Sequence, residues 1–239
     1  MVIAAVLVGC NTAEQTAETT SPPDTAEALP VDAVAFAVTG EETDPLVVTF
    51  SNGDKTVTYI PMIHIATTDF YGAVAEKVKQ RKEAGATLYY EFIDFDLLDD
   101  DNKRKVRAMV AILPTPEMYS ELSGDGHMGQ NNDAFLGLVN DKDVNIDMTP
   151  MELIEAYEDA FGVIEVTGED ATSDLSEMAT TILPPENVSK IAIDLRSQKA
   201  ASAINNGPDN DIVLLFGAGH GPGIFSELQA LDPDWKRTS

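Results

Sequence analysis

The sequence predicts an α/β fold, in which the strands of one or more central sheets are flanked by helices. Two strand–loop–helix half-units carry this prediction, one around His64 and one around His220. In each, a run of apolar or β-branched residues leads through a short loop into helical spacing, an alternation typical of α/β proteins. We expect the two half-units to pack together, with a helical insertion between them in the chain.

The first half-unit begins with a predicted β-hairpin. Runs rich in β-branched residues at 46–50 and 56–65 flank the dipeptide Asn52-Gly53. Asn-Gly supplies the positive φ angles of a tight turn, so the two runs are expected to pair as antiparallel strands.

A helix and a strand follow the hairpin. The residues at 67–69 can cap a helix at its N-terminus, and Gly85 is placed to end it. The apolar run at 86–93 is the next expected strand. Together with the preceding strand, these elements predict a βαβ unit with a right-handed crossover.

The middle of the chain is predicted to be mainly helical. An acidic run at 94–101 leads into a helix that extends through Ile112, and the Gly- and Asn-rich stretch 120–133 is expected to be a loop. A capping box with proline at the first helical position predicts a helix over 149–161.

The last third repeats the opening pattern after two more helices. These helices are expected over 170–182 and 186–204, each bounded by turn-forming residues. The apolar run 211–216 predicts a buried strand, and Pro222 can begin a helix that ends at Leu231.

Composition and charge exclude several classes of protein. The chain of 239 residues is 44% hydrophobic, which is enough for a folded core. Its net charge of −26 disfavours binding to nucleic acid or, through a basic surface, to anionic lipid. Such a charge suits a solvent-exposed protein or one that attracts cations. Disulfide pairing within the chain is excluded because Cys10 is the only cysteine.

The first thirty residues predict an export signal and a tether. Residues 1–10 end in Leu-Val-Gly-Cys, a pattern that resembles the lipobox at the end of a signal peptide, with Cys10 as the lipidated residue. The basic segment that normally comes earlier would lie upstream of this start. A buried N-terminal strand with an ordinary core cysteine is the alternative. Residues 11–30 carry few bulky apolar groups and are expected to be a disordered tether, so the folded domain is expected over 31–239.

Two of the three histidines lie where a strand passes into a helix. His64 and His220 take these positions, and Glu91 falls near the end of the strand between them in sequence. By alternation Glu91 points to the same side as Tyr89. Open α/β sheets bind ligands at the carboxyl ends of their strands, so these three residues are candidates for a shared divalent-metal site. The alternative is a pair of histidines capped by backbone carbonyls and a solvated glutamate.

Other residues carry weaker signals. His127 lies in a glycine-rich loop and is either a third ligand or a solvated side chain. Asp147 either contacts a metal ligand without binding the metal itself, or stabilises the N-terminus of the following helix through its negative charge. The acidic run 94–101 lacks the glycine and terminal glutamate of an EF-hand, so it is expected to be a solvated face.

Four segments resemble the TraB/PrgY/GumN family, which is related to the Tiki proteases and to the erythromycin-esterase/ChaN-like superfamily. They are YIPMIHI, YYEFID, IAIDLRSQ and LLFGAGHGPGI, and they bracket nearly all of the expected domain. Gly217-Ala218-Gly219-His220 matches the family's Gly-x-x-His signature. At the first signature His64 is kept, but Pro61 stands where the family has glycine. The stretch NIDMTP, which contains Asn145 and Asp147, also resembles lipoprotein members.

The resemblance implies a metal-dependent hydrolase. His64, His220 and Glu91 would bind the metal, with Mn or Co expected and Zn as an alternative. Glu91 and Arg196 would be the catalytic residues, Arg196 stabilising an oxyanion or orienting a carboxylate, while Asn145 and Asp147 would support them. From the sequence alone, Arg196 pairing with an acid such as Asp194 is the alternative.

The expected function is therefore hydrolysis of a peptide or small-molecule substrate on the bacterial cell envelope. The protein would face the periplasm or the outside, would contact the membrane only through its lipid, and would bind no nucleic acid. The alternative is a lipoprotein of the same fold that binds haem, a metal or a peptide without catalysis.

Overall fold

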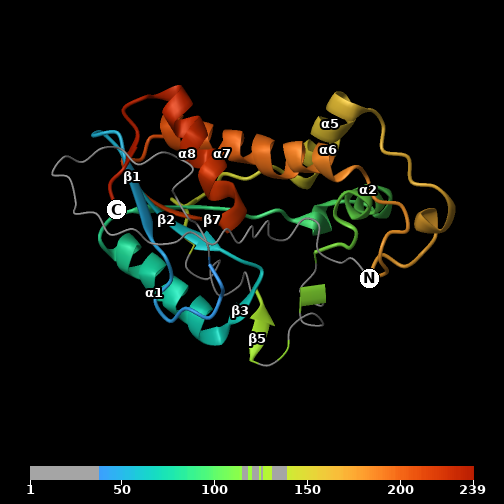
Figure 1. Cartoon of the computed structure of the whole chain (residues 1–239), viewed down its shortest axis with the longest axis horizontal. Coiled ribbons are helices and arrows are strands. Elements are labelled where there is room, and N and C mark those ends of the chain that lie inside the picture. Colours follow the sequence, from blue (N-terminus) through green and yellow to red (C-terminus); the bar gives the residue numbers. More distant parts are fainter. Residues whose placement is uncertain (1–37, 115–117, 120–123, 125, 131–138) are drawn as a thin grey trace, which may run out of the picture.

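The computed structural model describes residues 38–114, 118–119, 124, 126–130 and 139–239. Within these ranges the protein has a six-stranded mixed sheet flanked by helices, which confirms the α/β prediction (Figure 1). None of the helices in these ranges is long and apolar enough to cross a membrane. The predicted lipobox at Cys10 and the predicted tether at 11–30 lie outside the described residues.

The strands of the sheet lie in the order β6-β4-β7-β2-β1-β8. Neighbours from β6 to β2 are parallel, and the β2–β1 and β1–β8 pairs are antiparallel. The strands are β1 (Val48–Ser51), β2 (Thr56–Met62), β4 (Thr87–Tyr90), β6 (Val144–Asn145), β7 (Asp211–Gly217) and β8 (Lys236–Arg237).

The predicted hairpin is confirmed in β1 and β2. Ser51 lies opposite Thr56, and Gly53 in the turn between them has φ = 95°, a backbone angle that residues with a Cβ rarely adopt. The second strand ends at Met62, earlier than predicted. A separate short strand, β3 (Ile65–Thr67), follows it.

Strand β7 lies between β2 and β4, so the predicted βαβ unit is split. Its register with β2 runs from Thr56 opposite Asp211 to Met62 opposite Gly217. The two half-units therefore share one sheet, with β2 and β7 parallel at its centre. Because their carboxyl ends coincide, the loops that carry His64 and His220 leave the sheet side by side.

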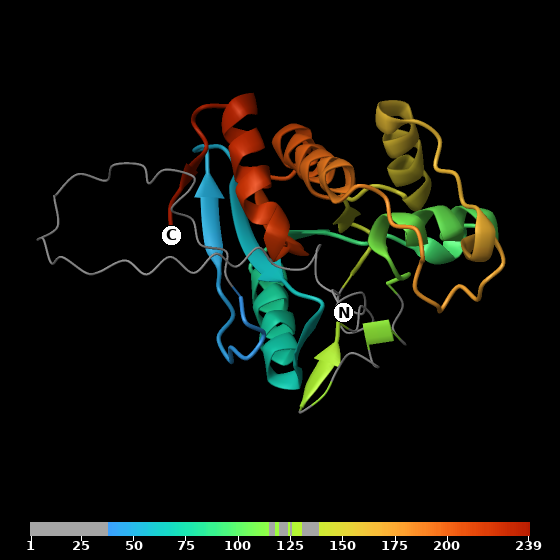
Figure 2. The same cartoon turned by 45° about the vertical axis from the view of Figure 1, so that its right-hand side comes forward.

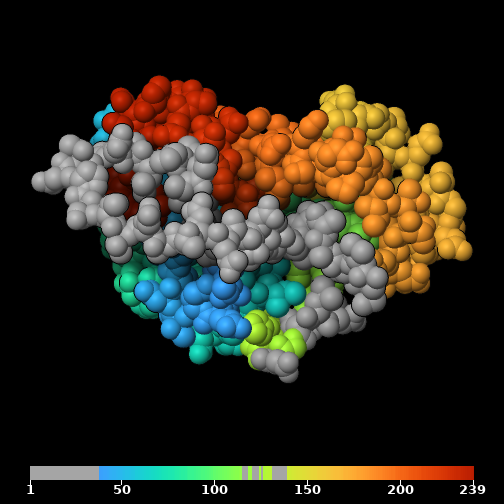
Figure 3. Space-filling view, viewed as in Figure 1, coloured from blue at the N-terminus to red at the C-terminus, as the bar shows by residue number. Residues whose placement is uncertain are grey.

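Helices cover both faces of the sheet (Figures 1 and 2). On one face, α1 (Thr68–Glu83) packs Phe70, Val74 and Val78 against the sheet, and Thr67 caps the helix as predicted. On the other face lie α7 (Arg196–Asn206) and α8 (Gly221–Leu231), with Ile204 and Phe225 in the core. In the space-filling view these two helices belong to the continuous orange-to-red layer (Figure 3).

A third core lies among the helices beyond the sheet, where the helical insertion was expected. It is built by α2 (Asp100–Val110), α5 (Pro150–Phe161), α6 (Pro185–Ser189) and the π-helical turn η4 (Lys190–Leu195). Thr149 and Glu152 form the predicted capping box of α5. The predicted helix 186–204 is confirmed as α6, η4 and α7 in succession, with the π turn as a feature that the sequence pattern did not indicate.

The predicted helix over 170–182 is wrong. Only a 3₁₀ turn, η3 (Gly168–Ala171), forms there, and the chain then continues as turns and extended backbone. The carboxylate of Asp170 accepts hydrogen bonds from the N–H and hydroxyl of Thr180 and from the N–H of Thr181. Short polar side chains that bond to nearby backbone compete with helix formation, and here they fold the segment into a loop.

Arg107 of α2 holds the same loop from inside. Its side chain is fully buried and donates to the carbonyl oxygen of Asp170 at 2.8 Å and to that of Glu177 at 3.2 Å. The segment forms no α-helix beyond the short turn η3, and the arginine supplies donors to these carbonyl oxygens.

The loop predicted over 120–133 is only partly described. Residues His127–Gly129 form strand β5, which pairs antiparallel with β3 in a separate two-stranded sheet, so the loop prediction is wrong for these residues. Backbone hydrogen bonding to β3 replaces the irregular structure that the glycines suggested.

Candidate functional site

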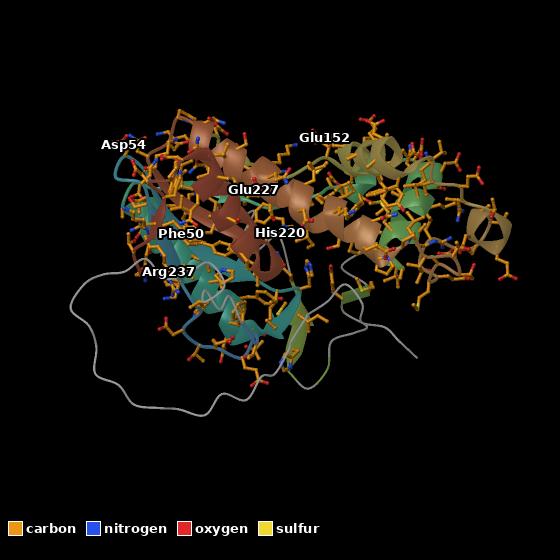
Figure 4. The ribbon with its side chains drawn as sticks, turned by 45° about the horizontal axis from the view of Figure 1, so that its top comes forward. Phe50, Asp54, Glu152, His220, Glu227 and Arg237 are labelled. Atoms are coloured by element: carbon orange, nitrogen blue, oxygen red, sulfur yellow. The ribbon has the colours of Figure 1, made fainter. Side chains whose placement is uncertain are left out.

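The candidate site lies at the carboxyl ends of β2, β4 and β7. Glu91 directly follows β4, and its N–H donates to the carbonyl oxygen of Leu215 on β7. Tyr89 is buried in the core beneath α7 and α8, and the carboxylate of Glu91 also reaches α7. The predicted alternation is therefore confirmed. His220 is labelled in Figure 4 between the sheet, where Phe50 lies, and the helix that carries Glu152.

Both oxygens of the Glu91 carboxylate accept hydrogen bonds. Oε1 accepts from Nη2 of Arg196, and Oε2 accepts from the N–H of Gly217. Burial raises the pKa of Glu91, but Arg196, His220 and the Gly217 N–H outweigh it and lower the pKa to about 2. Glu91 is therefore a carboxylate at neutral pH.

Arg196 links Glu91 to Asp147. Its Nε and Nη2 donate to the two oxygens of Asp147 at 2.8 and 2.7 Å, and Nη1 donates to the carbonyl oxygen of Ala192. With the bond to Glu91, four of its five N–H groups have partners. Arg196 therefore pairs with Glu91 and Asp147, and not with the suggested Asp194. Both the carboxylate-orienting role and the alternative of an arginine paired with an acid include such contacts.

Asp147 is held in place by the segment that precedes α5. Burial raises its pKa, which the bonds from Arg196 oppose, and both of its oxygens accept N–H groups, as an ionised carboxylate does. Asn145 accepts from the N–H of Asp147 and donates to the carbonyl oxygen of Phe92. The two residues thus tie the end of β4 to the start of α5, behind Arg196.

His220 is almost completely buried beneath the sheet end. Its Nδ1 lies 3.0 Å from Oγ of Ser197 and its Nε2 lies 3.9 Å from Oε1 of Glu91. The ring meets that of Phe216 edge-on. Burial lowers the pKa of His220 to about 4, although Glu91 opposes this, so the imidazole is neutral at about pH 7.

His64 lies on the open side of the same site. Its residue is exposed, and its ring stacks on that of Tyr119 with centroids 5.2 Å apart. Desolvation nevertheless lowers the pKa of His64, and Glu91 and Arg196 both act on it, in opposite directions. Burial and Glu91 raise the pKa of Tyr119 to about 12, so its hydroxyl keeps its hydrogen at neutral pH. His64 is therefore reachable from solvent and lies within the electrostatic reach of the other site residues.

Pro61 does not interrupt the strand that leads to His64. It pairs in register with Phe216 of β7, while the pairing of β2 with β1 extends no further than Tyr59. A proline lacks an N–H, which matters only where a neighbouring strand needs that donor. The strand therefore continues through the position at which the family signature has glycine.

His127 lies apart from these residues. It is in β5, opposite Thr67, and its Nε2 is 3.9 Å from a carboxylate oxygen of Glu41. Within the described parts of the chain, no group of three or more His, Cys, Asp or Glu side chains is spaced to hold a metal ion as the side chains stand.

Two residues of the site were not predicted. Ser197 touches His220 and directly follows Arg196 in the sequence, so its position beside a candidate was the available signal. Tyr119 comes from the middle of the chain, where no motif marks it. Gly217 was noted only as part of the Gly-x-x-His segment, and no signal indicated that its N–H binds Glu91.

Comparison of the chain with protein-family models, with curated proteins and with solved structures gave no match.

Proposed function

We propose that this protein is a divalent-metal-dependent hydrolase that cleaves peptide or other amide bonds at the bacterial cell envelope, where Cys10 would carry its lipid anchor. The observation that carries the hydrolase proposal is the pair formed by Glu91 and His220. An ionised carboxylate and a neutral imidazole face each other at 3.9 Å at the ends of adjacent parallel strands.

The charge of the site favours a cation. Glu91 is ionised and Arg196 carries one positive charge, while the two histidines are neutral near pH 7. Burial raises the pKa of Asp147, but all its hydrogen-bond partners are N–H donors. With both carboxyl groups ionised, one negative charge in this largely buried cluster is uncompensated. Such a charge is costly unless a cation or a further donor lies against it.

The donor atoms also fit a divalent ion in kind and in span. Imidazole nitrogen and carboxylate oxygen are the ligands of catalytic sites for Zn²⁺ and similar metals. Two such atoms at about 2.1 Å from one ion can be at most about 4.2 Å apart, and the Glu91–His220 separation of 3.9 Å lies within that limit. His64, which is solvent-accessible beside them, would complete the set.

Each side chain then has a defined task. The bound cation would polarise a scissile carbonyl group and lower the pKa of a water molecule. Glu91, with a pKa of about 2, is too weak a base for general-base catalysis and is better suited to hold the cation. Arg196 and Asp147 would fix the rotamer of Glu91, and His64 would bind the cation from the solvent-exposed side of the site.

The amide-bond and envelope parts of the proposal depend on the sequence. The four segments that resemble the TraB/PrgY/GumN family support amide hydrolysis, and the Leu-Val-Gly-Cys pattern supports export and lipidation. A net charge of −26 is compatible with a protein held away from anionic phosphate groups by a tether.

The test is titration of the metal-free protein with Mn²⁺, Co²⁺ and Zn²⁺, followed by hydrolysis assays on a peptide library. We expect one ion per chain, with binding lost in Glu91→Gln and in His220→Gln. His127→Gln is the matched control, because His127 lies in the small β3–β5 sheet, 3.9 Å from Glu41, and the variant should bind like the wild type.

Three outcomes separate the hypotheses. Metal binding with hydrolysis supports the proposal. Metal binding without hydrolysis of any peptide would favour the non-catalytic binding protein instead. If the folded wild type binds none of the three ions, the metallohydrolase proposal is wrong.

A further inference from the structure

Arg196 and Ser197 are consecutive residues that contact two different parts of the site. Arg196 reaches Glu91 and Asp147, while Ser197 reaches His220. They follow directly after the π turn η4. π turns are rare in proteins, and those that occur are often found at functional sites. The turn therefore sets the start of α7 so that neighbouring side chains meet Glu91 and His220 together.

The hydroxyl of Ser197 has only one hydrogen, and its neighbours determine where that hydrogen points. Oγ lies 2.7 Å from the carbonyl oxygen of Ile193, which can only accept. The hydrogen is therefore directed at Ile193, and Oγ acts as an acceptor toward Nδ1 of His220 at 3.0 Å. Nδ1 must then carry the hydrogen of the neutral imidazole.

The burial of Ser197 and His220 limits the hydrogen-bond partners that each of them can have. Ser197 is fully buried and His220 is 3% exposed, so no bulk water replaces either partner. The Ile193 carbonyl also acts on His220 as a hydrogen-bond acceptor and raises its pKa. Ser197 Oγ is thus the acceptor that faces Nδ1.

The opposite nitrogen of the ring then has a free electron pair. Nε2 faces the Glu91 carboxylate at 3.9 Å, and neither atom has a hydrogen to share. Two acceptors that face each other repel unless a cation or a donor lies between them. The orientation of His220 therefore suits a cation or a hydrogen-bond donor placed between Nε2 and Glu91.

We propose that Ser197 is a positioning residue that holds His220 in the tautomer with hydrogen on Nδ1 and so turns the Nε2 electron pair toward Glu91. This role depends on the proposed function in one respect, the identity of the ligand that the Nε2 electron pair would bind. The tautomer itself follows from the hydrogen bonds and is testable without any metal.

Close packing against α8 keeps Ser197 in this position. A Cβ on Gly223 would come within 2.9 Å of Oγ and 3.0 Å of Cβ of Ser197, so glycine lets the two helices approach. Ser197→Ala only removes an atom from this contact, and we expect the variant to fold. Ser202→Ala is the matched control, since Ser202 lies exposed on the same helix and accepts a hydrogen bond from Asn206.

The decisive measurement is the tautomer of His220 by ¹⁵N NMR of the metal-free full chain at about pH 7. The three histidines can be assigned by single His→Gln variants. We expect hydrogen on Nδ1 of His220 in the wild type and in Ser202→Ala, and a mixture of tautomers in Ser197→Ala. Hydrogen on Nε2 in the wild type, or an unchanged Ser197→Ala spectrum, would overturn the proposal.

Mn²⁺ titration of the same variants separates this proposal from the proposed function. Loss of a group that orients a metal ligand typically weakens metal affinity about 10- to 100-fold, and we expect this for Ser197→Ala but not for Ser202→Ala. If Ser197→Ala changes the tautomer yet the wild type binds no metal, the metallohydrolase proposal fails and the positioning role of Ser197 stands. If the wild type binds Mn²⁺ and Ser197→Ala binds it equally well, Ser197 does not position a ligand.

Discussion

Arg196 joins two carboxylates that would otherwise repel each other in the site. Asp147 takes the planar fork of Nε and Nη2, and Glu91 takes the remaining hydrogen of Nη2. A guanidinium can serve both partners because its donors are rigid and separately directed, whereas an ammonium is a point charge. Arg196 thus keeps the carboxylate of Glu91 ionised and holds it in one rotamer.

The pKa of Glu91 predicts how acid affects stability. Its value of about 2 in the folded protein lies below the ordinary 4.5, so the ionised form stabilises the fold above about pH 4.5. This contribution should be lost as the pH falls from about 5 through 2. We expect Glu91→Gln to lower the free energy of unfolding by roughly 2–3 kcal/mol at about pH 7, and the difference from wild type to shrink below about pH 4.

Urea unfolding at a series of pH values measures this difference. Glu152→Gln is the control, because the pair of Glu152 with Lys199 is partly exposed and a glutamine can still accept the Thr149 N–H of the capping box; we expect it to change stability by less than about 1 kcal/mol. A Glu91→Gln difference that stays constant down to about pH 3 would contradict the assigned pKa.

At the scale of elements, the turn after β7 positions the site through a glycine. The N–H of Gly217 binds Glu91, and a Cβ at this residue would lie 3.1 Å from Oε2 of Glu91 and 3.4 Å from Cδ2 of His220. The backbone must approach the two side chains this closely for its N–H to reach the carboxylate. The requirement for glycine here is therefore steric rather than conformational, since Gly217 has φ = −54°, an angle open to other residues.

Substitution of Gly217 tests this requirement. We expect Gly217→Ala to displace Glu91, to weaken Mn²⁺ binding about 10-fold or more and to cost about 1–3 kcal/mol of stability through overpacking. Gly219→Ala is the matched control in the same turn, because a Cβ there would have no heavy atom within 4 Å. Calorimetric titration and thermal unfolding of both variants provide the comparison, and equal effects of the two substitutions would contradict this account.

At the scale of the whole molecule, negative charge far exceeds positive charge. The chain has 41 acidic residues against 15 Lys and Arg. Many of the basic side chains are already engaged within the fold, including Lys82 with Asp143, Lys105 with Glu158 and the buried Arg107. The excess acidic groups thus repel one another across the surface, which destabilises the compact state.

Salt should therefore stabilise the fold. Raising KCl from about 0.01 M to about 1 M shortens the screening length from about 30 Å to about 3 Å, which weakens repulsion between distant charges more than it weakens close or buried pairs. We expect the melting temperature to rise by roughly 5 °C or more over this range. Differential scanning calorimetry checks it, with sucrose of equal osmolality as the control; a melting temperature that falls with KCl would contradict the prediction.

Local chemistry made part of this fold predictable. Asn52-Gly53 marked the hairpin, Thr149 and Glu152 marked the start of α5, and the apolar run of β7 marked a central strand. These signals depend on a few adjacent residues. The segment 170–182 was mispredicted because its structure depends on Arg107, which is distant in sequence and lends its donors to the loop.

The features of the site also separate into those that local sequence predicts and those that only tertiary contacts determine. By itself the sequence determined that His64 and His220 follow strands and that Glu91 shares a face with Tyr89, since strand alternation and strand ends are local properties. Only the tertiary structure decided that β7 inserts between β2 and β4, that Arg196 bridges Glu91 and Asp147, and that Ser197 faces His220. These contacts join residues from different elements, and the packing of α7 and α8 onto the sheet, rather than any neighbouring residue, brings them together.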